Sequence, residues 1–215
     1  MIAFDRGEAL RYLGYKAGQQ PDEAVEQRLL RCVSEMQNAV QPKSVFRAFP
    51  LAQPAEGTLE LAGVTVCSKN LSRNLKGCGS IYLMAVTLGI GVDRLIARAS
   101  AVRMSDAVLY QAIAAAMIET YCDTVNDALR QEAARAGLYC RPRFSPGYGD
   151  FRLEHQRDLC RLLDTPRKIG LTVTESCLLA PVKSVTAVIG LSSEPQPCHR
   201  KGCEECGKTD CAYRR

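Results

Sequence analysis

Residues 105–136 read SDAVLYQAIAAAMIETYCDTVNDALRQEAARA, and this stretch has the clearest helical pattern in the chain. Its apolar residues recur at three- and four-residue spacing, as they do on the buried face of an α-helix. Ser105 and Asp106 are residue types that cap helix starts, and Gly137 is a typical stop. The pattern therefore predicts one long, central helix. The residues that define its apolar face are Leu109, Ile113, Ala116, Met117, Tyr121, Val125 and Leu129.

Shorter segments on both sides of this helix have either helical or strand-like patterns. Helical spacing predicts helices over residues 5–15, 22–40 and 92–100. Alternating or short continuous apolar runs predict strands over residues 58–66, 81–88, 171–174 and 185–191. Residues 42–54 are expected to form a connection, and residues 68–79 a loop or a short helix. Because helices and strands are loosely segregated along the chain, the sequence predicts an α+β fold with a mainly antiparallel sheet.

The composition is that of a globular protein, since 47% of the 215 residues are hydrophobic and 24% are charged. The net charge is +5, and basic residues are interspersed with acidic ones, so we expect no nucleic-acid partner. The most apolar stretches, residues 80–92 and 109–118, are shorter than the roughly 18 to 20 residues that cross a bilayer. The N-terminus lacks the pattern of a secretory signal. We therefore expect a cytoplasmic protein with no membrane partner.

A short loop motif at residues 143–148, RFSPGY, contains side chains suited to ligand binding. The guanidinium of Arg143 is a planar fork that matches a carboxylate. Gly147 lets a backbone approach a ligand closely, and Tyr148 offers a ring face and a hydroxyl group. Taken alone, the motif is also compatible with a simple loop that contains a salt-bridging arginine.

The segments that follow the motif make a ligand-binding interpretation more specific. Residues 170–176 read GLTVTES, Ala180-Pro181 comes next, and residues 184–190 read SVTAVIG. This ordered set resembles the C-terminal activation domain of cobalamin-dependent methionine synthase, where an Arg-x-x-x-Gly-Tyr loop precedes a Thr-Glu-Ser strand and a Ser-Val-Ser/Thr strand. The resemblance is densest over residues 143–190 and extends over residues 1–192. It implies a curved α+β domain that holds S-adenosylmethionine over a corrinoid.

The resemblance also implies a set of residues that contact S-adenosylmethionine. Arg143 matches the arginine of the family motif and is expected to pair with the methionyl carboxylate. Gly147 and Tyr148 match the Gly-Tyr of the motif and are expected to line the same pocket. Ile189 and Gly190 fall where the family contacts the nucleoside from a strand, and this contact is expected through the backbone, although the aromatic residue of the family is absent here.

Two acidic residues are further candidates, and each has a structural alternative. Asp5 lines up with an acidic residue that contacts the ligand, for which the ammonium group is a sensible partner, but aspartate is also a preferred helix cap. Glu119 lies in a small and apolar stretch, so its carboxylate needs a partner, either the ligand ammonium or an internal arginine. Glu175 can likewise hold its strand to the Arg143 loop. His155 lies among charged residues and is expected on a solvated helix face.

The last 23 residues, 193–215, are expected to form a separate cysteine-rich, metal-binding tail. Cys198, Cys203, Cys206 and Cys211 have the spacing Cys-x4-Cys-x2-Cys-x4-Cys. In a reducing compartment such a cluster indicates metal ligands rather than disulfides. The spacing fits either zinc or an iron–sulfur cluster. We favour the cluster, because a protein that passes an electron to cobalt has a use for a redox centre.

Together these observations predict a stand-alone reactivation subunit of cobalamin-dependent methionine synthase. It binds S-adenosylmethionine as the methyl donor for reductive methylation of cob(II)alamin, and it acts as a methyltransferase component only with a partner. We find no corrinoid-binding signature, so a partner polypeptide must bear the cobalamin, and an electron donor is also required. One alternative is reactivation of another corrinoid methyltransferase. Another is an iron–sulfur or zinc interaction protein or sensor that retains the fold.

Overall fold

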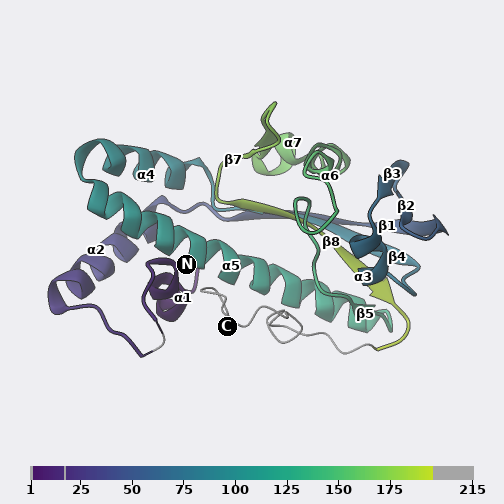
Figure 1. Ribbon diagram of the computed structural model, residues 1–215, viewed down its shortest axis with the longest axis horizontal. Coiled ribbons are helices and arrows are strands. Elements are labelled where there is room, and N and C mark those ends of the chain that lie inside the picture. Colours follow the sequence, from purple (N-terminus) through teal and green to yellow (C-terminus); the bar gives the residue numbers. More distant parts are fainter. Residues whose placement is uncertain (1, 17, 196–215) are drawn as a thin grey trace.

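The computed structural model describes residues 2–16 and 18–195 and has an α+β fold (Figure 1). Its main sheet has six strands in the order β3-β2-β1-β4-β8-β5, and all neighbouring strands run antiparallel. A second, two-stranded sheet consists of β6 and β7. The predicted fold class, a mainly antiparallel sheet packed with helices, is confirmed. The helices are α1 (Arg6–Tyr12), α2 (Glu23–Ala39), α3 (Lys69–Asn74), α4 (Ile90–Val102), α5 (Met104–Arg135), α6 (His155–Leu163) and α7 (Thr165–Ile169). The strands are β1 (Lys43–Ala55), β2 (Thr58–Leu61), β3 (Val64–Cys67), β4 (Ser80–Thr87), β5 (Tyr139–Cys140), β6 (Thr172–Val173), β7 (Leu179–Ala180) and β8 (Ser184–Ser192).

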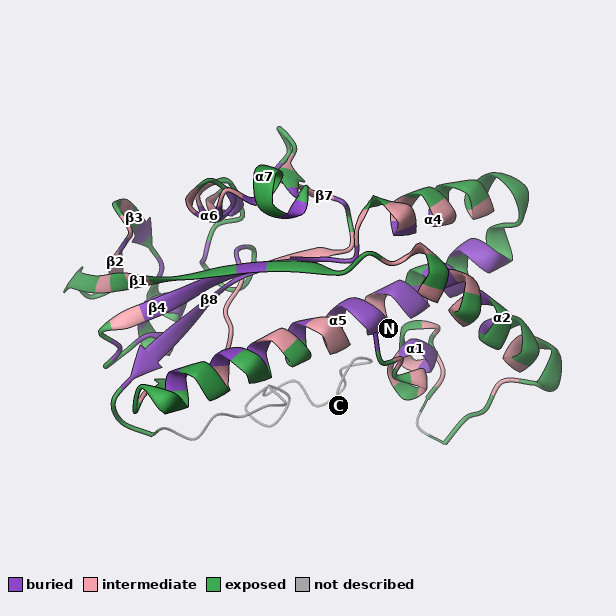
Figure 2. Cartoon of the chain, turned by 180° about the vertical axis from the view of Figure 1, so that it is seen from behind, coloured by how far each residue is buried: buried purple, intermediate pink, exposed green. Residues whose placement is uncertain are grey.

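The central strands β4 and β8 are buried on both faces, which explains their continuous apolar sequences. In β4, Tyr82 and Met84 face the layer formed by α1, α2, α4 and α5. Ile81 and Leu83 point to the opposite face, where they pack with residues of α6 and α7. Figure 1 shows α5 along one side of the sheet and α6 and α7 on the other, and Figure 2 shows the buried residues of β4 and β8 between them. Helices on both faces therefore enclose two apolar cores that share these strands.

The long helix α5 has 32 residues and extends along the sheet, about 48 Å at the standard rise per residue. It ends near Gly137, which has a positive φ of 71°, as predicted. The start, at Met104, lies within one residue of the predicted one, but the predicted cap is wrong, because Arg103 occupies the N-cap position and no side chain caps the helix. Asp106 instead accepts a hydrogen bond from Arg31 of α2 at 2.9 Å, which links the two helices. Although α5 is long, no helix within the described ranges is both long and apolar enough to cross a membrane.

The strand β1 was not predicted, since residues 42–54 lack an alternating apolar pattern and contain Pro50 and Pro54. Most of its residues are exposed, which removes the sequence signal of a half-buried strand. Its first part, from Lys43 to Pro50, pairs with β4, and its last part pairs with β2. Pairing with other strands, and not the local sequence, therefore determines this element.

The predicted strand over residues 58–66 is in fact a hairpin of β2 and β3. Ala62 and Gly63 form its tight turn with positive φ angles of 52° and 82°. Two consecutive positive φ angles are typical of two-residue hairpin turns whose twist matches the flanking strands. The apolar residues alternate on both sides of the turn, and the change of phase at Ala62-Gly63, from Leu59 and Leu61 to Val64 and Val66, is the local sign of two strands.

Gly190 in β8 faces a crowded environment, and we expect Gly190→Ala to destabilise the fold. A Cβ atom there would lie 2.6 Å from Cys78 Sγ, 2.7 Å from Leu75 Cδ2 and 2.9 Å from Arg141 Cγ. Overpacking of this kind lowers the free energy of unfolding by about 1–3 kcal/mol. Gly79→Ala is the matched control, because a Cβ atom there meets nothing within 4 Å. Equilibrium unfolding in urea measures the difference, and equal stability of the two variants would contradict this packing.

Candidate functional site

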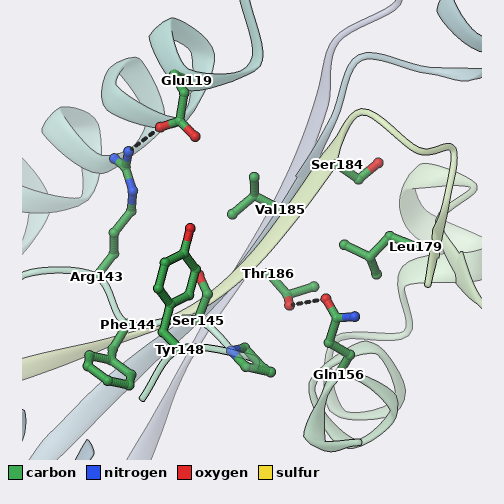
Figure 3. A pocket seen from close by; sticks show the side chains of 11 residues that line it. Glu119, Arg143, Phe144, Ser145, Tyr148, Gln156, Leu179, Ser184, Val185 and Thr186 are labelled. Carbon is green, nitrogen blue, oxygen red and sulfur yellow. Dashed lines mark hydrogen bonds and ion pairs between the residues drawn. The ribbon is translucent and has the colours of Figure 1, made fainter. Parts of the chain in front are cut away.

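A cavity of about 440 Å³ lies where the loop after β5 passes between α5 and the beginning of β8. This volume is within the range of small-molecule sites in proteins. Figure 3 shows charged side chains at one end of the cavity and uncharged polar and apolar side chains at the other. The lining residues are Glu119, Arg143, Phe144, Ser145, Pro146, Tyr148, Gln156, Leu179, Ser184, Val185 and Thr186.

Arg143 forms the charged end together with two carboxylates of α5. Its Nη2 atom lies 2.9 Å from Oε2 of Glu119, and its Nη1 atom lies 2.5 Å from Oδ1 of Asp123. The two carboxylates are four residues apart, so they lie on the same face of the helix. Burial alone would lower the pKa of Arg143, but the hydrogen bond to Asp123 and the neighbouring negative charges raise it above its ordinary value. The guanidinium therefore stays charged, and the three groups carry a combined charge of −1.

Backbone hydrogen bonds hold the loop that contains Arg143 against β8 and against itself. Phe144 donates its N–H to Val188 O at 2.9 Å and accepts the N–H of Val188 at 2.8 Å. Gly147, with a positive φ of 92°, donates its N–H to Phe151 O at 2.7 Å. The ring of Phe151 is buried and packs in the core beside α6. The loop is therefore a fixed part of the cavity wall.

Asp150 links the end of this loop to the N-terminus of α3 by hydrogen bonds. Its carboxylate accepts hydrogen bonds from Ser68 Oγ at 2.5 Å, from the Lys69 N–H at 2.8 Å and from the Asn70 N–H at 3.1 Å. The hydrogen bond from Ser68 is the main cause that lowers the pKa of Asp150 below its ordinary value; burial opposes it, and the two backbone N–H groups assist it. This carboxylate therefore caps α3 from a distant part of the chain.

The opposite end of the cavity contains uncharged polar groups. Gln156, at the start of α6, donates a hydrogen bond from Nε2 to Cys177 O at 2.5 Å. Thr186 of β8 lies 3.5 Å from Gln156, measured between Oγ1 and Oε1. Ser184 donates to Thr87 Oγ1 at 2.8 Å, and Leu179 of β7 adds an apolar surface. Gln156 and Thr186 are both buried.

The structure brings three of the predicted ligand residues together, since Glu119, Arg143 and Tyr148 all line this cavity. Glu119 has an internal arginine partner, Arg143, which was one of its two predicted alternatives. Tyr148 is 69% exposed, and Figure 3 shows its ring beside Arg143. Gly147 belongs to the same loop but does not line the cavity.

Asp5 occupies a neighbouring position. It is the N-cap of α1, and its side chain accepts the N–H of Glu8 at 3.0 Å. It also lines an open cavity of about 690 Å³ on the other side of α5, where Asp123 is a further lining residue. Asp5 is therefore a helix cap. It lies near the charged end of the Arg143 cavity, because Asp123 both lines the cavity of Asp5 and pairs with Arg143.

Ile189 and Gly190 lie apart from the cavity. The Ile189 side chain is fully buried in the core on the α5 side of the sheet. Gly190 pairs with Ile81 of β4, and its carbonyl oxygen accepts the N–H of Arg141 at 2.8 Å. Neither residue lines the cavity beside Arg143.

His155 and Glu175 have structural contacts that differ from those expected. The ring of His155 stacks on Phe151 at 5.4 Å, and its Nδ1 atom lies 3.0 Å from Asp158 Oδ2. This helix face is thus partly buried, whereas a solvated face was predicted. Arg157 donates a hydrogen bond to the backbone carbonyl of Glu175. Neither His155 nor Glu175 lines the cavity.

Sequence reasoning missed Asp123, Gln156, Ser184 and Thr186. Asp123 follows Glu119 by four residues on a predicted helix, and this spacing was a usable signal. Thr186 lies on a predicted strand and Ser184 immediately precedes that strand; the two are two residues apart, so in extended backbone they share a face. Gln156 had no local signal, because its position depends on how α6 packs over β8.

The predicted metal ligands Cys198, Cys203, Cys206 and Cys211 lie outside the residues that the structure describes. Within residues 2–16 and 18–195, no group of three or more His, Cys, Asp or Glu side chains is arranged to hold a metal ion. Cys32, Cys78, Cys122 and Cys160 are buried thiols that form no disulfide with the described part of the chain.

Comparisons with known proteins agree with this architecture. A family model described as "Vitamin B12 dependent methionine synthase, activation domain" matches residues 75–199, which is more than half of the chain. The fold is similar to that in a structure titled "Crystal Structure of the MetH Reactivation Domain bound to AdoHcy", with a TM-score of 0.63 and 18% sequence identity. The similarity covers 87% of this chain and 73% of that chain. No curated protein matches the sequence.

We expect Asp150→Asn to destabilise the protein at neutral pH, because a neutral amide accepts hydrogen bonds more weakly than a carboxylate. The pKa of Asp150 is lowered in the folded state, so its stabilising effect is present above the unfolded pKa, about 4, and is lost as the pH falls through the folded value. The stability deficit of the variant should be full at pH 7 and should shrink towards pH 3. Urea unfolding at pH 7, 5 and 3 measures this trend.

Glu56→Gln is a suitable control for that experiment. Glu56 lies at the β1–β2 turn and makes no ion pair or side-chain hydrogen bond with the part of the chain that the structure describes. Its variant should keep the stability of the unmodified protein. A deficit in Asp150→Asn that stays constant from pH 7 to pH 3 would show that the charge of Asp150 is not what stabilises the loop.

Proposed function

The chain belongs to the activation-domain family of vitamin B12-dependent methionine synthases, and on this premise we propose that it binds S-adenosylmethionine in the cavity beside Arg143. It acts as a stand-alone subunit that reactivates a cobalamin-bearing methionine synthase. A separate electron donor takes part, because the methyl group is accepted only after one-electron reduction of cob(II)alamin. The single observation that carries the proposal is the arrangement of Arg143, Glu119 and Asp123 at one end of a cavity of suitable size.

The charged end is complementary to the methionyl part of S-adenosylmethionine. The α-carboxylate of the ligand pairs with the guanidinium of Arg143, for which a bidentate contact is favourable. The α-ammonium group pairs with Glu119 or Asp123. Because Arg143 then also binds the ligand carboxylate, it neutralises these two side chains less than before. The site carries a charge of −1, whereas the ligand, with its sulfonium, carries a net charge of +1. Binding therefore replaces an internal ion pair with two ligand contacts of the same kind.

The chain contributes placement, and the cofactors contribute the reactive chemistry. The cobalamin of the partner supplies the nucleophile for the sulfonium methyl group. The residues of this chain bind the two ends of S-adenosylmethionine and leave its sulfonium between them. Tyr148, which is 69% exposed, stands at the open side of the cavity. An open cavity suits transfer to an acceptor that another polypeptide carries.

We expect Arg143→Ala to weaken S-adenosylmethionine binding by about 10- to 150-fold, which corresponds to the loss of hydrogen bonds to a charged group. Arg143→Lys keeps the charge without the fork and should bind with intermediate affinity. Arg47→Ala is the matched control, since Arg47 lies on β1 away from the cavity and contacts Phe49. Isothermal titration calorimetry measures the affinities, after circular dichroism has shown that each variant is folded.

Methylation of a cobalamin-bearing methionine synthase completes this test. With a chemical reductant and labelled S-adenosylmethionine, the unmodified chain should transfer the label to the cobalamin, and Arg143→Ala should not. Unchanged affinity in Arg143→Ala, or no S-adenosylmethionine binding by the unmodified chain, would overturn the proposed function.

For the tail we propose that Cys198, Cys203, Cys206 and Cys211 bind one iron–sulfur cluster, with zinc as the alternative. Anaerobically purified protein should contain either iron with acid-labile sulfide or about one zinc ion, by the usual four-thiolate stoichiometry. Cys203→Ser should lose the metal, whereas Cys67→Ser, which changes an exposed thiol of β3, should keep it. Elemental analysis and the visible spectrum distinguish the two metals, and a metal-free protein would contradict the proposal.

A further inference from the structure

The two ends of the cavity differ in chemistry, and the proposed function uses only the charged end. Arg143 and Glu119 lie at one side of the cavity, and Gln156 and Thr186 lie at the other (Figure 3). A ligand held at Arg143 by its amino-acid group therefore extends its remaining part towards Gln156 and Thr186. On the proposed function, that part is the nucleoside.

The side chain of Gln156 has a defined orientation. The backbone carbonyl of Cys177 accepts a hydrogen bond from Gln156 Nε2 at 2.5 Å. A carbonyl oxygen cannot donate, so the amide nitrogen must face Cys177 and the amide oxygen must face the other way, towards Thr186. The hydrogen bond to Cys177 thus orients Gln156 so that its Oε1 atom is an acceptor on the cavity wall.

The hydrogen bond that Thr186 donates to Gln156 is long, so a ligand that offers better partners can replace it. Their oxygen atoms are 3.5 Å apart, whereas hydroxyl-to-oxygen hydrogen bonds are normally about 2.7–2.8 Å. The two residues are only 7% and 2% exposed. Buried polar groups with such a long contact gain energy from a ligand that offers a donor and an acceptor side by side. The apolar side chain of Leu179 lies near them in the cavity and suits the face of a planar ring (Figure 3).

We propose that Gln156 and Thr186 recognise the base of the bound nucleoside and make the site selective for adenine over other purines. Oε1 of Gln156 accepts a hydrogen bond from the exocyclic amino group, and the hydroxyl of Thr186 donates to the adjacent ring nitrogen. Hypoxanthine presents an oxygen to Oε1 of Gln156, where two acceptors repel each other, and an N–H to Thr186, whose hydroxyl must then accept instead of donate. This assignment rests on the proposed function and places the nucleoside at residues other than Ile189 and Gly190.

The test compares S-adenosylhomocysteine with S-inosylhomocysteine, which differ only in these two positions of the base. The unmodified protein should bind the adenosyl compound about 10- to 100-fold more tightly, the discrimination typical of a good pair of base contacts. Gln156→Met should reduce this ratio towards one, mainly by weakening the adenosyl compound, and Thr186→Val should weaken the adenosyl compound as well. Thr186→Ser keeps the hydroxyl group and should keep the ratio.

Gln27→Met is the matched control for Gln156→Met, because Gln27 pairs with Glu23 on α2 and does not line the cavity. Equal affinity of the unmodified protein for the two compounds overturns the inference even where a variant fails to fold. Tight adenosyl binding that is insensitive to both substitutions also overturns it and leaves the proposed function intact. A protein that binds neither compound nor S-adenosylmethionine overturns both.

Discussion

The antiparallel pairing of β4 with β8 is the constraint on which the rest of the structure depends. Eight consecutive residue pairs, from Ser80 with Leu191 to Thr87 with Ser184, join these strands at the centre of the sheet. Because their side chains are apolar on both faces, each face must be covered by helices. The long helix α5 covers one face, and α6 and α7 cover the other. The candidate site lies at the beginning of β8, where Ser184, Val185 and Thr186 line a cavity and the strand is not yet fully enclosed.

Elements with a strong internal pattern were predictable, whereas elements defined by their neighbours were not. The helix α5 follows the helical periodicity of side-chain direction, and the strands β4 and β8 are short continuous apolar runs, as strands buried on both faces are. The strand β1 is mostly exposed and contains Pro50, so only its pairing with β4 and β2 identifies it. The same holds for Asp106, whose residue type suits a helix cap but whose carboxylate pairs with Arg31 of another helix. Residue types indicate what a side chain can do, and tertiary contacts decide which partner it has.

The residues of the candidate site also include some that the sequence predicted and some that only tertiary packing brings together. Arg143 and Tyr148 belong to a motif that is continuous in sequence, and both line the cavity. Gln156 and Asp123 come from different elements, and packing alone brings them to the two ends of the cavity. Ile189 and Gly190 pack inside the sheet, and neither lines the cavity.

Arg143, Glu119 and Asp123 together carry a net negative charge, and this charge affects the direction of the proposed reaction. Glu119 and Asp123 outnumber the single guanidinium, so the charged end favours a ligand that carries net positive charge. S-adenosylmethionine has a net charge of +1, but after loss of the sulfonium methyl group the product is a zwitterion with no net charge. The attraction that helps to hold the substrate is therefore weaker for the product. Charge pairs near a protein surface interact with an effective dielectric constant of about 20, and salt reduces the effect further. The preference is consequently modest, but its sign is fixed by the two carboxylates: it favours entry of the methyl donor and release of the demethylated product.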